Sequence, residues 1–232
     1  MNDDFFDIIL ERYELLFGRK NRPWLNEAEL NFVIDMCDCY RSFRSVRKDD
    51  FNNVPLVIIF RYLECTHHYY RFNRLARIEQ TIEQMKQDWD DDHPLLYLLP
   101  NFFARFSQSL LLHIREEEEI LFPYLKMLNH VNEKKSRLMD FIEYRNPVNL
   151  KHYMNHHDDD HELEFEKVLL ALKHYEPSST NRSLYNVFQQ QILNFRNDLA
   201  VHGSLEESVL LPRCIIIEKE LKTLVKRSPV EN

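Results

Sequence analysis

Hydrophobic residues recur at the spacing of amphipathic helices along most of the chain, and prolines and asparagines interrupt the pattern. Capping residues stand before Pro55, Pro94 and Pro147, and proline suits the first turn of a helix. Shorter helices are predicted at about residues 4–17 and 26–45, and the segment 130–145 is predicted to be helical too. The four long helices that the pattern predicts cover about residues 54–88, 94–129, 147–175 and 181–225.

Glycine is almost missing from the sequence, since only Gly18 and Gly203 occur in 232 residues. A β-rich or Rossmann-type chain needs many glycines for turns and phosphate loops. The predicted fold class is therefore all-α. We expect a four-helix bundle over residues 54–225 and an N-terminal helical extension over residues 1–50.

The charge pattern gives no sign of a nucleic-acid partner. The net charge is −8, and the one short basic cluster, at residues 41–48, is interpreted as a solvated helix end. The N-terminus lacks the features of a signal peptide, and no apolar run approaches the roughly 20 residues of a membrane span. We therefore expect a cytoplasmic protein without a membrane partner, whose four scattered cysteines are reduced and mostly buried.

An internal repeat is the most informative feature of the sequence. The segments 113–123 and 202–212 both read His-x3-Glu-Glu-x-aliphatic-Leu-[Phe/Leu]-Pro. A histidine pair precedes each segment, at residues 67–68 and 156–157, with a matching offset (113 − 68 and 202 − 157 are both 45). Each half thus resembles a helical hairpin with one His on its first helix and His-x3-Glu on its second.

His and Glu four residues apart project from the same face of a helix. His113 and Glu117 interrupt an apolar stripe, and His202 and Glu206 do the same in the second copy. A carboxylate that faces the core is costly unless it is paired or bound to a metal. Because chance would have to place His, Glu and Pro in phase twice, the repeat favours a metal site, whereas Glu116 and Glu119 are interpreted as solvated.

The histidine pairs leave one choice open. His67 and His68 each lie on a line of apolar residues at helical spacing, and the offset pairs either His68 with His157 or His67 with His156. The apolar line of His157 is the better one, which favours His68 and His157, and His161 is a candidate for a supporting role beside the ligands or on an access path. The predicted metal ligands are His68, His113, Glu117, His157, His202 and Glu206.

Four imidazoles and two carboxylates exceed the needs of one ion but suit two ions with bridging carboxylates. A mixture of nitrogen and oxygen donors suits iron, with manganese or zinc possible. Ferritin-like di-iron proteins use Glu-x-x-His instead, and only Glu64-x-x-His67 fits that pattern, without a partner copy.

With these residues, the chain resembles the iron–sulfur cluster repair (repair of iron centres) di-iron family, which has a hemerythrin-like domain. The two His-x3-Glu segments carry the resemblance, together with His157-Asp158 and the position of His68 seven residues before Leu75. It covers about residues 54–215, and Ala76 stands where the family usually has a proline. The N-terminal Cys-Cys-Gly-Gly domain of full-length members is not found in residues 1–50.

The resemblance implies an oxo-bridged non-haem centre of two iron ions, bridged by Glu117 and Glu206. It also implies a role in restoring iron–sulfur clusters after nitrosative or oxidative stress, through iron supply or nitric oxide handling. The expected partners are iron–sulfur proteins as clients and nitric oxide or oxygen as a small ligand, with a homodimer as a candidate assembly. The alternatives are a hemerythrin-like protein that binds or senses oxygen or nitric oxide without turnover, with His161 or His67 as a fifth histidine, and a helical scaffold without metal.

Overall fold

The computed structural model describes a helical protein, and no strand occurs in the part of the chain that it describes. This confirms the all-α class. The described residues are 4–18, 25–42, 44–88, 94–134, 137–144, 149–151, 153, 159–175 and 182–227.

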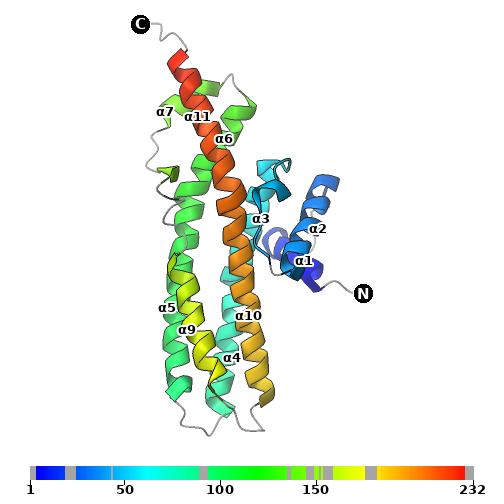
Figure 1. Ribbon diagram of the computed structural model, residues 1–232, viewed down its shortest axis with the longest axis vertical. Coiled ribbons are helices and arrows are strands. Elements are labelled where there is room, and N and C mark those ends of the chain that lie inside the picture. The colour runs from blue at the N-terminus through cyan, green and yellow to red at the C-terminus, as the bar shows by residue number, and fades with distance from the viewer. Residues whose placement is uncertain are drawn as a thin grey trace.

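Four helical columns lie side by side (Figure 1). Helix α4 contacts α5 and α10, and α9 contacts the same two helices, so the four close into a bundle. The columns are α3 (Leu56–Tyr69) continued by α4 (Leu75–Asp88), α5 (Pro94–Glu116) continued by α6 (Phe122–Glu133), α9 (Asp159–Lys173), and α10 (Arg182–Leu205) continued by α11 (Leu211–Arg227); the short helix α7 (Leu138–Glu143) follows α6.

The predicted helices agree with these elements. The predicted segments 54–88, 94–129 and 181–225 each correspond to one column. Helix α1 (Asp4–Phe17) has the predicted bounds, and α2 (Glu27–Ser42) ends three residues before its prediction. The predicted start at Asn146-Pro147 lies outside the described residues.

Three of the columns contain a short π-helical segment between their two helices. These segments are Tyr70–Arg74, Glu117–Leu121 and Glu206–Leu210. Two of them end two residues before Pro123 and Pro212, where proline cannot donate the usual helical hydrogen bond. The wider turn lets the helix pass these prolines without a break, and π-helical turns are frequent at functional sites.

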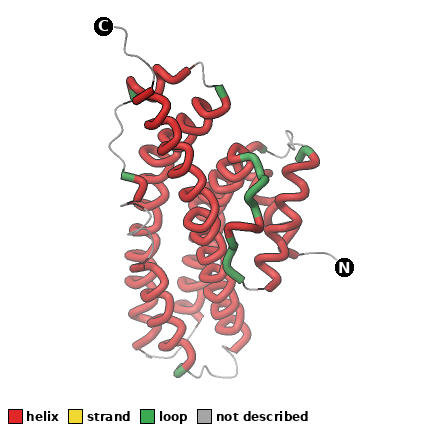
Figure 2. The backbone as a smooth tube through the Cα atoms, turned by 45° about the horizontal axis from the view of Figure 1, so that its top comes forward, coloured by secondary structure: helices red, strands yellow, loops and turns green. Residues whose placement is uncertain are grey.

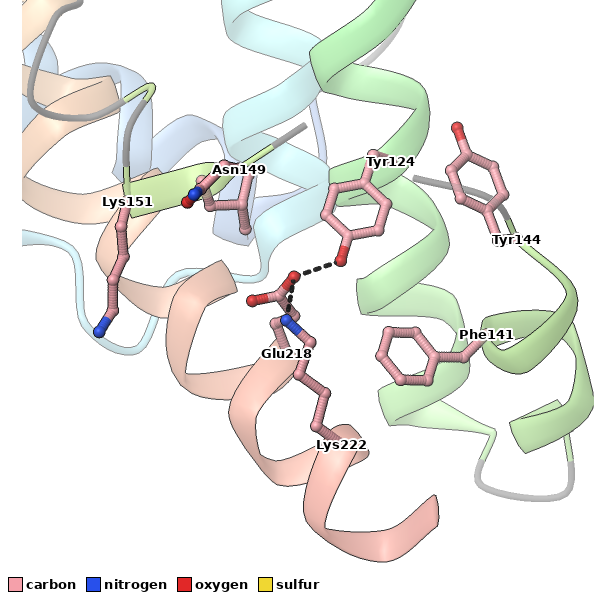
Figure 3. A pocket seen from close by; sticks show the side chains of 8 residues that line it. Tyr124, Phe141, Tyr144, Asn149, Lys151, Glu218 and Lys222 are labelled. Atoms are coloured by element: carbon pink, nitrogen blue, oxygen red, sulfur yellow. Dashed lines mark hydrogen bonds and ion pairs between the residues drawn. The ribbon is translucent and has the colours of Figure 1, made fainter. Parts of the chain in front are cut away.

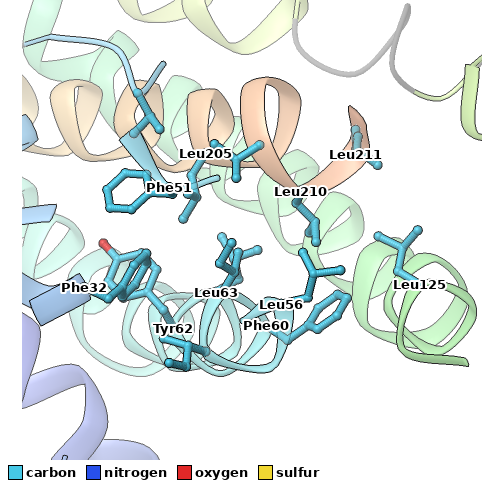
Figure 4. Packing of buried hydrophobic residues seen from close by; sticks show 14 of the residues in the cluster. Phe32, Phe51, Leu56, Phe60, Tyr62, Leu63, Leu125, Leu205, Leu210 and Leu211 are labelled. Atoms are coloured by element: carbon cyan, nitrogen blue, oxygen red, sulfur yellow. The ribbon is translucent and has the colours of Figure 1, made fainter. Parts of the chain in front are cut away.

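The hydrophobic core has two parts. The upper core joins the N-terminal helices to α3, α6, α11 and the end of α10, and Figure 4 shows its packing around Leu63, Leu205 and Leu210. The lower core fills the space between α4, α5, α9 and the first part of α10. The three columns that consist of two helices each pass from one part of the core to the other. For example, Ile114 belongs to the lower core and Leu121 to the upper core.

The N-terminal helices pack against the bundle and share its upper core (Figure 2). The fully buried Arg12 of α1 reaches across to α10, where its guanidinium forms two hydrogen bonds of 2.9 Å with Asp198. It also donates to the hydroxyls of Tyr40, Tyr62 and Thr66 at 3.1–3.2 Å. Helices α1 and α2 are therefore built into the same core as the bundle.

All four cysteines are buried, as expected, and none forms a disulfide. None of the helices within the described ranges has the length and apolar character that a membrane crossing requires.

Candidate metal centre

Four polar side chains meet in the interior, between the upper and lower cores. His67 comes from α3, His202 from α10, and the two carboxylates stand at the first positions of the π-helical segments. One ligand atom from each lies within 4.8 Å of the others, and the four residues are between 0% and 6% exposed. The four residues are His67, Glu117, His202 and Glu206. Because these side chains could together hold a metal ion, we call the set of four residues the metal cluster.

The carboxylate of Glu117 lies between two imidazoles. Its Oε2 atom is 3.2 Å from Nε2 of His67, and its Oε1 atom is 3.4 Å from Nε2 of His113. The hydroxyl of Tyr153 also donates to Oε1, at 3.3 Å. Each oxygen of Glu117 therefore faces a different histidine.

The second repeat completes the metal cluster from the opposite side. Nε2 of His202 lies 3.4 Å from Oε1 of Glu206 and 3.0 Å from Nε2 of His67. The His-x3-Glu pairs of both repeats thus converge on the same place, and a π-helical turn begins at each of the two glutamates. Glu117, His202 and Glu206 are buried, in agreement with the inward direction predicted for them, whereas His113 keeps 21% of its side chain exposed.

Aromatic rings form the walls of the metal cluster. Phe122 stacks on His67 at a centroid distance of 5.5 Å, and Tyr70 packs edge-on against His202 at 5.7 Å. Two carboxylates in such surroundings are costly without a compensating positive charge. Burial alone would lower the pKa of His67, but its contacts with Glu117 and Glu118 raise that pKa to about 9.

The preference for His68 over His67 requires a correction. His67 is fully buried in the metal cluster, whereas His68 is partly exposed and its ring lies 4.6 Å from that of Phe72. Adjacent residues on a helix point about 100° apart, so only one of the two imidazoles faces the interior. The structure therefore brings His67 to the position that the sequence pattern favoured for His68.

The other predicted ligands have different outcomes. His113 lies beside Glu117 with 21% of its side chain exposed, at the edge of the metal cluster. His157 lies outside the described residues, and so does His156. The side chain of His161 is likewise outside the described part of the chain.

Two residues of the site were not predicted from the sequence. Tyr153 is not among the predicted ligands, yet its hydroxyl reaches Glu117, and burial together with that carboxylate raises the pKa of Tyr153. Glu118 belongs to a run of four glutamates, yet its Oε1 atom lies 3.3 Å from Nδ1 of His67. Helical periodicity gives no signal for Glu118, because it is adjacent to a residue that already faces inward.

The donor set fits a metal ion. Imidazole nitrogens and carboxylate oxygens are the ligands that iron, manganese and zinc accept in proteins, and a mixed set of this kind suits iron. A bound cation would also compensate the two buried carboxylates. The described residues that together could hold a metal ion are His67, Glu117, His202 and Glu206, and His113 lies beside Glu117.

A cavity of about 470 Å³ lies between α6, α7, α11 and residues 149–151 (Figure 3). Glu218 projects into it and accepts hydrogen bonds from Tyr124, at 2.5 Å, and from Lys222, at 2.9 Å. Asn149 in its wall is one helical turn before Tyr153, which contacts Glu117. No residue of the metal cluster lines this cavity, so the cavity is not part of the site.

Comparisons with protein-family models, with curated proteins and with solved structures find no match to this chain. The functional conclusion therefore starts from the metal cluster itself.

Proposed function

We propose that this chain is a hemerythrin-like di-iron protein that helps to repair iron–sulfur clusters damaged by nitrosative or oxidative stress in the cytoplasm. The observation that carries the proposal is the carboxylate of Glu117, whose two oxygens face two different imidazoles within the bundle. A single-ion site would not need this arrangement, whereas a bridged pair of ions does.

The chain's residues supply two neighbouring sets of donors. One set consists of Oε2 of Glu117 with His67, His202 and Glu206. The other consists of Oε1 of Glu117 with His113, to which the repeat adds one histidine of the pair 156–157. In this proposal Glu117 connects the two sets, and Glu206 is available as a second bridge.

The two sets differ in their access to solvent. His67 and His202 are buried, whereas His113 is 21% exposed at the edge of the site. Iron held on the His113 side would be the more easily released to a client, or the more easily reached by nitric oxide or oxygen. Bound iron would supply the redox and ligand-binding chemistry, and the aromatic walls would keep bulk water from the inner set.

Metal content tests the first half of the proposal. We expect about two irons per chain after anaerobic reconstitution with Fe²⁺, since the donor sets hold a bridged pair. His202→Ala should lose iron, whereas His174→Ala should not, because His174 is exposed and its ring contacts only the backbone of its own helix among the contacts described. Protein that stays metal-free, or equal iron in both variants, would contradict the proposal.

Recovery of a cluster enzyme tests the second half. A strain without this protein should regain aconitase-type activity slowly after a nitric oxide pulse, and the wild-type chain should restore the rate. His202→Ala should fail to do so, and His174→Ala should succeed. Normal recovery in the deletion strain would favour the alternative, a protein that binds or senses oxygen or nitric oxide.

A further inference from the structure

The imidazole of His67 lies between two successive glutamates. Its Nε2 atom faces Glu117 at 3.2 Å, inside the metal cluster, and its Nδ1 atom faces Oε1 of Glu118 at 3.3 Å. Both nitrogens of one buried ring therefore have a carboxylate beside them. The other oxygen of Glu118, Oε2, accepts a hydrogen bond of 2.9 Å from Arg71.

The local helix geometry explains how this arrangement arises. Arg71 is four residues after His67, so its side chain can reach the same face of the column. Glu117 and Glu118 stand at the first two positions of a π-helical segment, and together they reach around the edge of the His67 ring. Glu118 keeps 28% of its side chain exposed, which places it at the rim of the site.

An imidazole that binds a metal through one nitrogen carries an N–H on its other nitrogen, and this N–H needs a hydrogen-bond acceptor. In metal sites a carboxylate commonly accepts that N–H, which fixes the tautomer and the orientation of the ring and makes it a better ligand. Oε1 of Glu118 lies 3.3 Å from Nδ1 of His67 without a hydrogen bond between them, so a small shift of this rim carboxylate would let it accept the N–H. Arg71 holds the other oxygen of Glu118.

We infer that Glu118 is a positioning residue for His67, and that Arg71 in turn positions Glu118, so that Nε2 of His67 presents its lone pair to the metal cluster. The inference rests on the proposed metal site. It also separates the members of the charge run 116–119, because Glu116 and Glu119 are exposed, whereas Glu117 and Glu118 face His67.

The test uses the affinity of the full chain for Co²⁺ alone, measured by competition with a chelator. Glu118→Ala should weaken binding about 10- to 100-fold, the usual effect of removing such a partner. Glu119→Ala is the matched control from the same run and should bind like the wild type. Arg71→Ala should weaken binding in the same direction, and Glu118→Gln should recover part of the loss because it keeps an acceptor oxygen.

A second readout isolates positioning from general stability. In the Co²⁺ form the imidazole N–H of His67 should give a paramagnetically shifted proton signal that disappears in D₂O. Its exchange with solvent should be fast in Glu118→Ala and slow in Glu118→Gln and Glu119→Ala. Unchanged exchange in Glu118→Ala would overturn the inference.

The outcomes also separate this inference from the proposed function. If the wild-type chain binds no Co²⁺ and no iron, the metal site itself fails. If it binds metal and Glu118→Ala has the affinity of Glu119→Ala, the metal site stands and the role of Glu118 is refuted.

The inference stays testable even if Glu118→Ala fails to fold, as judged by circular dichroism. If Glu118→Ala does not fold, the comparison uses the isosteric Glu118→Gln together with Arg71→Ala. Weaker Co²⁺ binding in both of these variants than in Glu119→Ala supports the inference. Co²⁺ affinity equal to that of Glu119→Ala in either of them refutes it.

Discussion

Adjacent histidines on α3 have opposite environments. His67 is buried among His202, Glu117 and the ring of Phe122, whereas His68 is partly exposed beside Phe72. Their side chains are chemically identical, so any difference in metal binding between the two positions has to come from where the helix points them.

We expect His67→Ala to lose iron and His68→Ala to retain it. The reason is that only His67 places an imidazole nitrogen within ligand distance of Glu117 and His202. Elemental analysis of both variants after reconstitution measures this directly. Loss of iron in His68→Ala with retention in His67→Ala would show that the site uses the other face of α3.

The sequence predicted part of the site, for a physical reason. His202, Glu206 and Glu117 were predicted because their pairs interrupt an apolar stripe twice in phase, which a surface helix has no reason to do. The sequence analysis favoured His68 over His67, although the apolar lines of the two were nearly equal, because a wide apolar face accommodates either residue. Glu118 and Tyr153 belong to the site because of contacts between different columns. The periodicity of residues within one helix carries no information about such contacts.

The internal repeat now bears on the histidines that lie outside the described residues. The second motif follows the first by a fixed offset (202 − 113 is 89), and the same offset pairs His67 with His156 and His68 with His157. Since His67 is the inward member of its pair, we expect His156→Ala to lower the iron content and His157→Ala to leave it unchanged. Iron loss in His157→Ala alone would show that the two halves differ in phase, in favour of the sequence-based preference for His157.

At the scale of elements, the three π-helical segments start at the same distance before corresponding residues of their columns. Ala76, Pro123 and Pro212 each stand six residues after the start of a π-helical segment. Two of these segments begin at the glutamates of the metal cluster, and the third begins three residues after His67. The long helices were predictable from hydrophobic spacing, but the wide turns within them were not, because the spacing changes by only one residue at each turn.

The buried ion pair between α1 and α10 ties the N-terminal helices to the ligand-bearing helix. Asp198 is one turn before His202, and Thr66, another partner of Arg12, is adjacent to His67. We expect Arg12→Met to lower the free energy of unfolding by about 3–5 kcal/mol, because it leaves the Asp198 carboxylate buried without its main partner. Urea denaturation measures this change.

Arg77→Met is the matched control, since Arg77 pairs with Glu11 of the same helix α1 at the surface, at 3.3 Å. Exposed ion pairs contribute little, so this variant should lose no more than about 1 kcal/mol. The double variant Arg12→Met with Asp198→Asn should recover part of the loss, because it removes the unpaired charge. Equal stability of the Arg12 and Arg77 variants would show that the buried pair is not a structural link.

At the scale of the whole molecule, the metal cluster interrupts the core between its upper and lower parts. A metal that binds only the folded state stabilises it by mass action, by about 2.7 kcal/mol at a concentration of 100 times Kd. For a chain of this size we expect Fe²⁺ to raise the melting temperature by about 5–10 °C under anaerobic conditions. His202→Ala should show no such rise, and an equal rise in that variant would place the binding elsewhere.

The sequence predicted the all-α bundle better than it predicted how the N-terminal helices relate to that bundle. Scarce glycine and helical spacing predicted an all-α bundle, and the described residues form one. The predicted boundary near residue 50 gave no hint of how closely the two parts are joined. Ile9, Phe32 and Val33 pack into the same core as Leu63 and Leu205, because apolar residues far apart in sequence complete one another's burial.

Anomalous diffraction at the iron edge, from crystals of the iron-loaded chain, tests the central claim most directly. We predict two iron peaks on either side of the Glu117 carboxylate, with His67, His202 and Glu206 around one and His113 beside the other. A map without iron inside the bundle, or with a single ion that leaves His113 and one oxygen of Glu117 uncoordinated, would contradict the account.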